Sequence, residues 1–157
     1  MEEKVRFEDV LERDGRLVYT NRGVSMLPLL RQGKDVMIID KIGPEGCRRY
    51  DAVLFKRDNG QYVLHRVMEI RDRRYWILGD NCVNGEWVRE EQLLGVLSGV
   101  VRGGRKRTVS VNELGYRLYV RLWCVPWRLR IFLQRAVRFP RHCAWFFVRK
   151  ILKIQRK

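Results

Sequence analysis

Residues 51–67 read DAVLFKRDNGQYVLHRV, and they carry the clearest fold signal of the chain. Two runs rich in β-branched and aromatic residues, 51–56 and 61–70, flank the turn Asp58-Asn59-Gly60. The Asn-Gly pair favours the tight turn of a hairpin, because both residues tolerate positive φ angles. This segment therefore predicts two antiparallel strands joined by a short turn.

Similar runs recur on both sides of this hairpin, separated by glycine, proline and Asx turns. They predict strands over residues 16–20, 35–40, 74–78 and 93–101, preceded by a short helix over residues 8–13. Short strands separated by turns are typical of a mainly β domain that packs as a barrel or a sandwich.

The chain has 157 residues, and its net charge of +15 is unevenly distributed. Residues 102–157 contain 16 lysines or arginines and a single acidic residue, Glu113. The other 17 basic and 17 acidic residues lie within residues 1–101, which are neutral overall. We therefore divide the chain into a β-rich body, residues 1–104, and a basic tail, residues 105–157.

The tail has the pattern of amphipathic helices. Over residues 112–138 arginines recur at helical spacing beside leucine, tyrosine and tryptophan, and Pro126 divides this run into two pieces. A third helical piece is expected over residues 143–157. No run of 18 uncharged apolar residues occurs, so we do not expect a membrane-spanning helix.

Amphipathic helices of this kind suit the plane of an anionic membrane surface, where arginines contact headgroups and aromatic side chains enter the interface. We therefore expect the chain to be membrane-associated through its tail, on a side that the sequence does not assign. Nucleic acid is an alternative ligand of basic helices, and the large apolar faces disfavour it. A partner protein that covers the tail is a third option.

The cysteines and histidines do not form the pattern of a metal site. The chain has four cysteines but no C-x-x-C pair, and only two histidines. We expect free thiols, no metal ion and no cofactor. The four cysteines are Cys47, Cys82, Cys124 and Cys143.

Residues 23–30, GVSMLPLL, place Ser25 beside a glycine turn ahead of an apolar run. A serine hydroxyl is a weak nucleophile unless a base takes its proton. The only histidine of the body is His65, which strand alternation puts on the same face as Val63 and Val67. On this pattern alone, a core histidine bonded to the backbone is the better interpretation.

Two acidic residues could orient the imidazole, as the carboxylate of a catalytic triad does. Asp80 follows a predicted strand in Gly79-Asp80-Asn81, and Glu86 lies in Gly85-Glu86-Trp87. Acidic residues beside glycine are also common in turns. The order of serine, histidine and acid indicates a catalytic site more strongly than any one of these residues does.

Five motifs in this order resemble those of the signal peptidase I superfamily, which includes the self-cleaving LexA-type repressors. The likeness covers residues 23–101 and implies a mainly β, signal-peptidase/LexA-like body of the β-barrel type, followed here by the basic amphipathic helical tail. In chain order the motifs are Ser25-Met26-x-Pro28-x-Leu30, Asp35-Val36-Met37-Ile38, Asp51-Ala52-Val53-Leu54-Phe55, Leu64-His65-Arg66-Val67 and Gly79-Asp80-Asn81.

The chain departs from the family pattern at several positions. Lys34 separates Gly33 from Asp35, Tyr50 stands where glycine is usual, and Gly23 stands where many members have a hydroxyl residue. Signal peptidases also usually have a membrane-spanning segment before the serine, and none is predicted here. About 22 residues precede the serine motif, which is too few for the DNA-binding domain of a LexA-type repressor.

The His65-Arg66 pair resembles the branch that contains the endoplasmic reticulum and archaeal signal peptidases. This likeness implies that Ser25 is the nucleophile and His65 the general base. Glu86 would support the imidazole, with Asp80 as the alternative for that role and otherwise a brace of the Gly-Asp-Asn turn. Met26 and Pro28 would shape the floor of the substrate cleft, and the backbone N–H of Ser25 would help to bind the oxyanion.

The sequence thus predicts a serine endopeptidase of the signal peptidase type, which cleaves a precursor polypeptide that is exported or membrane-associated. The alternative is a catalytically inactive module with the same fold, whose basic tail binds a membrane or nucleic acid.

Overall fold

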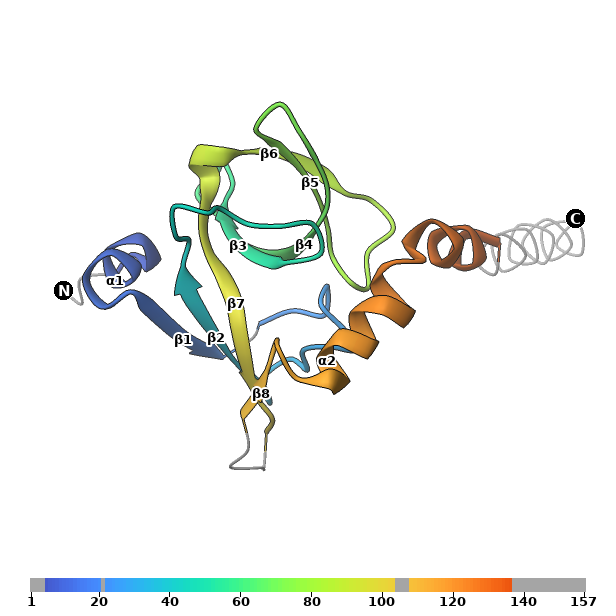
Figure 1. Cartoon of the computed structure of the whole chain (residues 1–157), viewed down its shortest axis with the longest axis horizontal. Coiled ribbons are helices and arrows are strands. Elements are labelled where there is room, and N and C mark those ends of the chain that lie inside the picture. Colours follow the sequence, from blue (N-terminus) through green and yellow to red (C-terminus); the bar gives the residue numbers. More distant parts are fainter. Residues whose placement is uncertain (1–4, 21, 104–107, 137–157) are drawn as a thin grey trace, which may run out of the picture.

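The computed structural model describes residues 5–20, 22–103 and 108–136. Within them the chain is mainly β, as predicted, with eight strands in one antiparallel sheet and a few short helices (Figure 1). In chain order the elements are α1 (Phe7–Asp14), β1 (Arg16–Thr20), β2 (Val36–Lys41), β3 (Ala52–Lys56), β4 (Tyr62–Arg71), β5 (Arg74–Leu78), β6 (Glu86–Arg89), the 3₁₀ turn η1 (Glu90–Gln92), β7 (Leu93–Val101), β8 (Thr108–Ser110), α2 (Leu114–Tyr119) and the π-helical turn η2 (Val120–Cys124).

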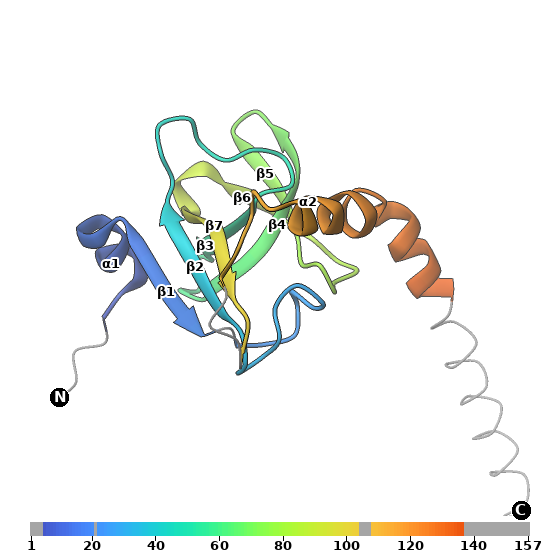
Figure 2. The ribbon, with the colours of Figure 1, turned by 60° about the horizontal axis from the view of Figure 1, so that its bottom comes forward.

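The sheet is open, so the predicted β-barrel is wrong. The strand order is β1-β2-β7-β3-β4-β5-β6, with β8 paired to β7, and among the described strands β1 and β6 are edges that do not pair with each other. Closure needs two edge strands that run side by side with a common stagger, whereas β6 has only four residues. Register shifts in the β2–β7, β3–β7 and β4–β5 pairings bend the sheet without closing it (Figure 2).

The hairpin predicted from residues 51–67 is present. β3 and β4 pair antiparallel, with Val53 opposite His65 and Leu54 opposite Leu64. Gly60 in the connecting turn has a φ of 83°, which glycine adopts without steric cost. The hairpin therefore sets the position of His65 in the sheet.

Side-chain alternation along β3 divides the core into two clusters. Leu54 packs in the first cluster with Ile39 of β2 and Leu11 of α1. Phe55 points to the opposite face and packs in the second cluster with Val67 of β4. All five side chains are at most 2% exposed, and burial of each contributes about 1.5–3 kcal/mol. The hairpin that carries His65 is thus anchored on both faces.

Part of the predicted basic tail, residues 105–157, packs on the β-rich body. β8 pairs with β7, Tyr116 of α2 joins the first core cluster, and Cys124 is buried. The predicted division at Pro126 is confirmed, because turn residues 125–126 separate η2 from a second helical run over residues 127–136. This run extends away from the sheet (Figure 2).

Two findings concern the prediction of tail helices. None of the helices in the described ranges is long and apolar enough to span a membrane. The helical piece predicted over residues 143–157 lies outside the described residues.

Strands β6 and β8 were not predicted. They have four and three residues, with sequences EWVR and TVS. A period-2 pattern needs more positions than this to stand out, so only pairing with β5 and β7 defines these strands.

Candidate active site

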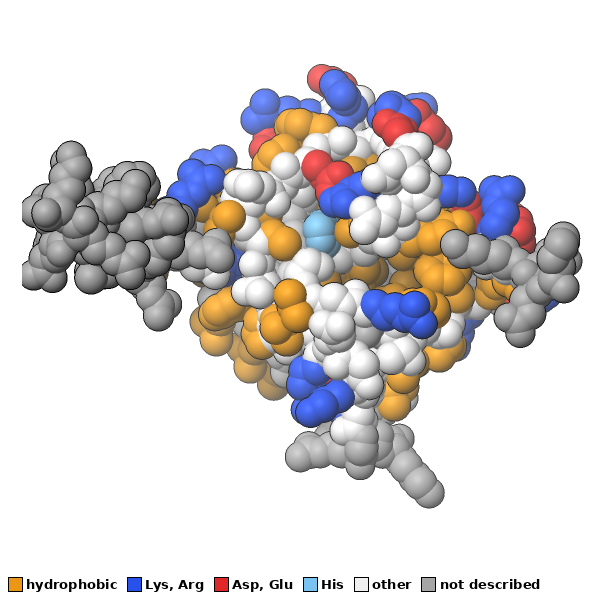
Figure 3. All heavy atoms as spheres, turned by 180° about the vertical axis from the view of Figure 1, so that it is seen from behind, with side chains coloured by type: hydrophobic (Ala, Val, Ile, Leu, Met, Phe, Trp, Pro, Cys, Tyr) orange, Lys and Arg blue, Asp and Glu red, His pale blue; other side chains and the backbone are white. Residues whose placement is uncertain are grey.

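Ser25 and His65 lie on the wall of one groove, although they are 40 positions apart in the sequence. The groove has a volume of about 620 Å³. Figure 3 looks into it and shows the histidine in a hollow, with hydrophobic side chains on either side. Around the predicted nucleophile and base, the wall includes Val24 and Ser25 after β1, Leu64 and His65 of β4, and Asn81 and Cys82 after β5.

The turn that carries Ser25 is held by burial of its apolar residues in the core and by hydrogen bonds from the loop after β5. Met26 and Leu30 are 1% and 0% exposed, and the Leu30 N–H donates to the Met26 carbonyl over 2.9 Å. From the side, the Asn81 N–H donates to the Ser25 carbonyl over 2.7 Å, and the Asn81 side-chain amide donates to the Val24 carbonyl over 3.3 Å. These contacts leave Ser25 half-buried at the groove.

Met26 and Pro28, which we predicted to shape the cleft, do not line it. Met26 is part of the first core cluster beneath the turn, and Pro28 is exposed. Neither residue belongs to the groove wall. The structure therefore places Met26 in the core beneath the serine turn, where it anchors that turn.

The Ser25 carbonyl and the His65 imidazole converge on Gly79. A Cβ atom at Gly79 would lie 2.8 Å from the Ser25 carbonyl oxygen, 3.1 Å from His65 Nε2 and 2.6 Å from Cys82 Sγ. Atoms this close cannot all be accommodated without movement, so the approach of the two predicted catalytic residues requires glycine at this position.

The environment of His65 keeps its imidazole neutral. The side chain is 8% exposed, and burial lowers its pKa to about 4. Glu86 raises this pKa, Arg57 lowers it, and Asp80 raises it by the smallest amount of the three. At neutral pH the imidazole is therefore free to accept a proton.

The Ser25 hydroxyl and the His65 imidazole have no hydrogen-bond partner among the described residues. Catalytic hydrogen bonds are frequently long or absent in enzymes without substrate and form only when the substrate is bound. The geometry thus places the two groups on one groove without a preformed bond.

Glu86 begins β6, and its carboxylate is bound by Arg57 of the groove wall. Arg57 Nε donates to Glu86 Oε2 over 2.9 Å, and Arg57 Nη2 contacts Oε1. Arg57 Nη1 also donates to Gln61 Oε1 over 2.7 Å. Glu86 therefore acts on His65 through its charge, because its oxygens bond to Arg57.

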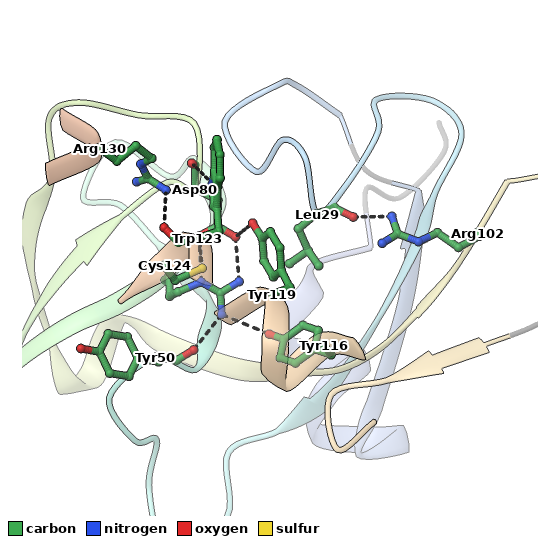
Figure 4. A network of polar contacts seen from close by, with 10 residues as sticks. Leu29, Tyr50, Asp80, Arg102, Tyr116, Tyr119, Trp123, Cys124 and Arg130 are labelled. Carbon is green, nitrogen blue, oxygen red and sulfur yellow. Dashed lines mark hydrogen bonds and ion pairs between the residues drawn. The ribbon is translucent and has the colours of Figure 1, made fainter. Parts of the chain in front are cut away.

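Asp80 is the centre of a buried network on the other side of the loop. Arg66 Nε and Nη2 each donate to an Asp80 oxygen over 2.7 Å, and the two side chains are 0% and 2% exposed. Burial by itself lowers the pKa of Arg66, but the carboxylate of Asp80 outweighs it and holds this pKa well above its usual value. Tyr119 and Trp123 also donate to Asp80, over 2.8 Å and 3.0 Å (Figure 4).

Three residues of this arrangement were not assigned a role from the sequence. Asn81 and Arg66 belong to quoted motifs, so their positions were visible but their contacts were not. Arg57 is 29 residues from Glu86, and no local pattern pairs them. Within the described ranges, no three histidine, cysteine or acidic side chains group together as metal ligands.

Comparison with known proteins assigns no family: no family model matches the chain, and no curated protein matches it.

Proposed function

We propose that the chain is a serine endopeptidase of the signal peptidase type that cleaves an exported or membrane-associated precursor. One observation carries the proposal. The turn of Ser25 and the imidazole of His65 meet at Gly79 in a groove, and burial keeps the imidazole neutral at pH 7. The five family-like motifs add support, since they contribute the serine, the histidine and the glycine.

The chemistry follows from these two groups. Ser25 Oγ attacks the carbonyl carbon of the scissile bond while His65 takes the hydroxyl proton. The imidazolium then gives this proton to the leaving amine, and water hydrolyses the acyl-enzyme with His65 again as the base. The Ser25 N–H is the donor available for the oxyanion within the serine turn.

The two acidic residues take different roles in this proposal. The charge of Glu86 stabilises the imidazolium that forms in the transition state, and Arg57 limits this effect, while burial keeps the resting imidazole neutral. Asp80 braces the loop after β5, whose next residue, Asn81, holds the Ser25 carbonyl. Asp80 is thus a positioning residue.

The groove suits an extended segment of a polypeptide chain. Part of its wall is aromatic: Phe7 stacks on Tyr62 at 4.5 Å and meets Tyr19 edge-on at 4.8 Å. Glu8, bound by Lys56 and Tyr62, holds α1 in this place. We therefore propose that apolar side chains of the precursor lie against this aromatic wall.

An inactive module with the same fold is the second candidate. It is favoured by the absence, among the described residues, of a hydrogen bond donated by His65 to either carboxylate. In that case the groove would bind a peptide without cutting it.

The deciding experiment uses the full chain with a fluorophosphonate probe, which modifies activated serines, and with precursors that carry export signals. The native chain and Ser110→Ala, a serine outside the groove, should be labelled and should cleave. Ser25→Ala and His65→Ala should lose both properties, with rates lower by roughly a thousandfold or more. Absence of labelling and cleavage in the native chain, or equal labelling of Ser25→Ala, would leave the inactive module as the function.

A further inference from the structure

We propose that the helical arm, residues 114–136, docks on an anionic lipid surface, and that docking steadies the loop that holds Ser25 and so activates the peptidase. The claim that the arm docks on lipid is argued from the exposed surface of the described helices. The claim that docking activates the peptidase rests on the proposed function.

The helical arm exposes a stripe of large apolar side chains. Its members recur at helical spacing within α2 and η2 and again within residues 127–136, on the two sides of the turn at residues 125–126, and each is 46–73% exposed. The opposite side of α2 and η2 already packs on the body through Tyr116 and Cys124. The exposed side, called here the apolar stripe, consists of Leu114, Leu118, Leu122, Leu129, Phe132 and Leu133.

The arginines beside the apolar stripe favour a negatively charged partner. The helical arm has five arginines and no acidic residue. Arg117, Arg121, Arg128 and Arg135 are exposed, and no carboxylate of the described residues pairs with them. Arginines of the body surface do pair with acids, as Arg16 does with Asp40 at 2.6 Å.

An anionic bilayer satisfies both features of the helical arm. Leucine and phenylalanine enter the acyl boundary while the unpaired arginines meet the headgroups. A second copy of the chain fits less well, because a symmetric contact would place arginines opposite arginines. A nucleic acid would leave the apolar stripe against phosphates or water.

The inner side of the helical arm is bonded to the loop of the candidate active site. Tyr119 Oη donates to Asp80 Oδ2, and Trp123 Nε1 donates to the Asp80 carbonyl (Figure 4). The next residue, Asn81, donates its N–H to the carbonyl of Ser25. Two consecutive residues thus connect the helical arm to the nucleophile.

The seat of residues 127–136 on the body is incompletely packed. A cavity of about 520 Å³ lies among Trp127, Ile131 and residues 83–85 of the loop. Arg130 and Gln134 of the same run do not line this cavity, but their Nε and Oε1 atoms are buried without a hydrogen-bond partner in the described part of the chain. A loosely packed contact has low local stability, so a lipid surface that favours the seated arm can shift the population toward it.

The test uses the full chain with vesicles of phosphatidylcholine, with and without phosphatidylglycerol. Co-sedimentation should show binding tighter by roughly tenfold or more when the anionic lipid is present. Hydrogen exchange of residues 79–82 should slow on these vesicles, and kcat for a short water-soluble peptide should rise several-fold with little change in KM. The first two readouts do not require catalysis, so they decide the docking and the bracing even if the proposed function fails.

Matched variants isolate the apolar stripe from the rest of the basic tail. Leu118→Gln/Leu122→Gln should weaken vesicle binding by roughly tenfold and abolish the slowed exchange, whereas Ile70→Gln, an exposed apolar residue of β4, should bind like the native chain. Native-like binding by the double variant, preference for duplex nucleic acid, or a dimer that the double variant dissolves would overturn the docking. Binding without slower exchange of residues 79–82 would overturn the activation.

Discussion

Arg57, on the wall of the groove that contains His65, binds both carboxylate oxygens of Glu86. The pair sets the charge that the imidazole experiences, because Glu86 raises the pKa of His65 while Arg57 lowers it. Arg57, which follows β3, therefore limits the effect of the Glu86 carboxylate on the pKa of His65.

Replacement of Arg57 by glutamine should move the acid limb of kcat/KM to higher pH. In the native chain this limb should lie near pH 4, the pKa of His65. Loss of Arg57 removes a cation and leaves Glu86 unpaired, and both changes favour the imidazolium. A pH–rate profile measures the shift, and Arg22→Gln, also on the groove wall but without a resolved effect on His65, is the control. An unmoved limb in Arg57→Gln would contradict the role of this pair.

The stability of the fold should fall as the pH drops from about 6.5 toward 4. The pKa of His65 is lowered from 6.5 to about 4 by burial, so the unfolded chain binds a proton in this range that the folded chain excludes. The contribution of the neutral His65 to the free energy of unfolding is fully present above pH 6.5. As the pH falls below this value, it is lost at up to about 1.4 kcal/mol per pH unit. Denaturant unfolding at several pH values measures it. His65→Gln should flatten this part of the curve, and a slope equal to that of the native chain would refute the prediction.

Gly79→Ala should lower kcat/KM by roughly a hundredfold, because displacement of catalytic groups by about 1 Å has effects of this size. The new Cβ would lie 2.8 Å from the Ser25 carbonyl oxygen and 3.1 Å from His65 Nε2. Gly115→Ala is the matched control, since its new methyl group would have no atom within 4 Å and helix α2 gains about 0.5–1 kcal/mol. Steady-state kinetics compare the two, and full activity of Gly79→Ala would show that the site tolerates this movement.

Asp80→Asn should destabilise the fold by about 3–5 kcal/mol, because it leaves the buried guanidinium of Arg66 without its counter-charge. The double variant Arg66→Met/Asp80→Leu should recover part of this loss, since it removes both buried charges. Urea unfolding of the native chain, Arg66→Met, Asp80→Leu and the double variant gives the coupling energy. If the double variant is as unstable as the sum of the singles, the pair is not coupled in the way described.

Tyr50→Val should be less stable than Tyr50→Asn by about 1–2 kcal/mol. Tyr50 has a φ of 77°, a left-handed conformation that asparagine tolerates and a β-branched residue does not. Both variants lose the contact of Arg49 with the ring, at 4.8 Å, so their difference reports the backbone. Thermal unfolding measures it, and equal stabilities would show that the turn relaxes. Tyr50 stands where the motif that it resembles usually has glycine, which fits this conformation.

Much of the sheet could be predicted from local pattern. The alternation in residues 51–70 and the Asn-Gly turn specify a hairpin because each signal lies within a few residues of the chain. β6 escaped prediction because four residues carry too little pattern. The open sheet escaped it because closure depends on where β1 and β6 lie relative to each other, which neither strand encodes.

The candidate site divides in the same way. The order of Ser25, His65 and the two acids, the charge difference between body and tail, and the helical break at Pro126 all follow from the linear chain. Packing of the sheet was needed to show that Arg57 binds Glu86 and that Asp80 joins Arg66 and the helical arm. Turns and periodic faces can be predicted because they depend on neighbours along the chain. The partners of the Asp80 and Glu86 carboxylates cannot, because they depend on which distant arginine the packed sheet brings within about 3 Å.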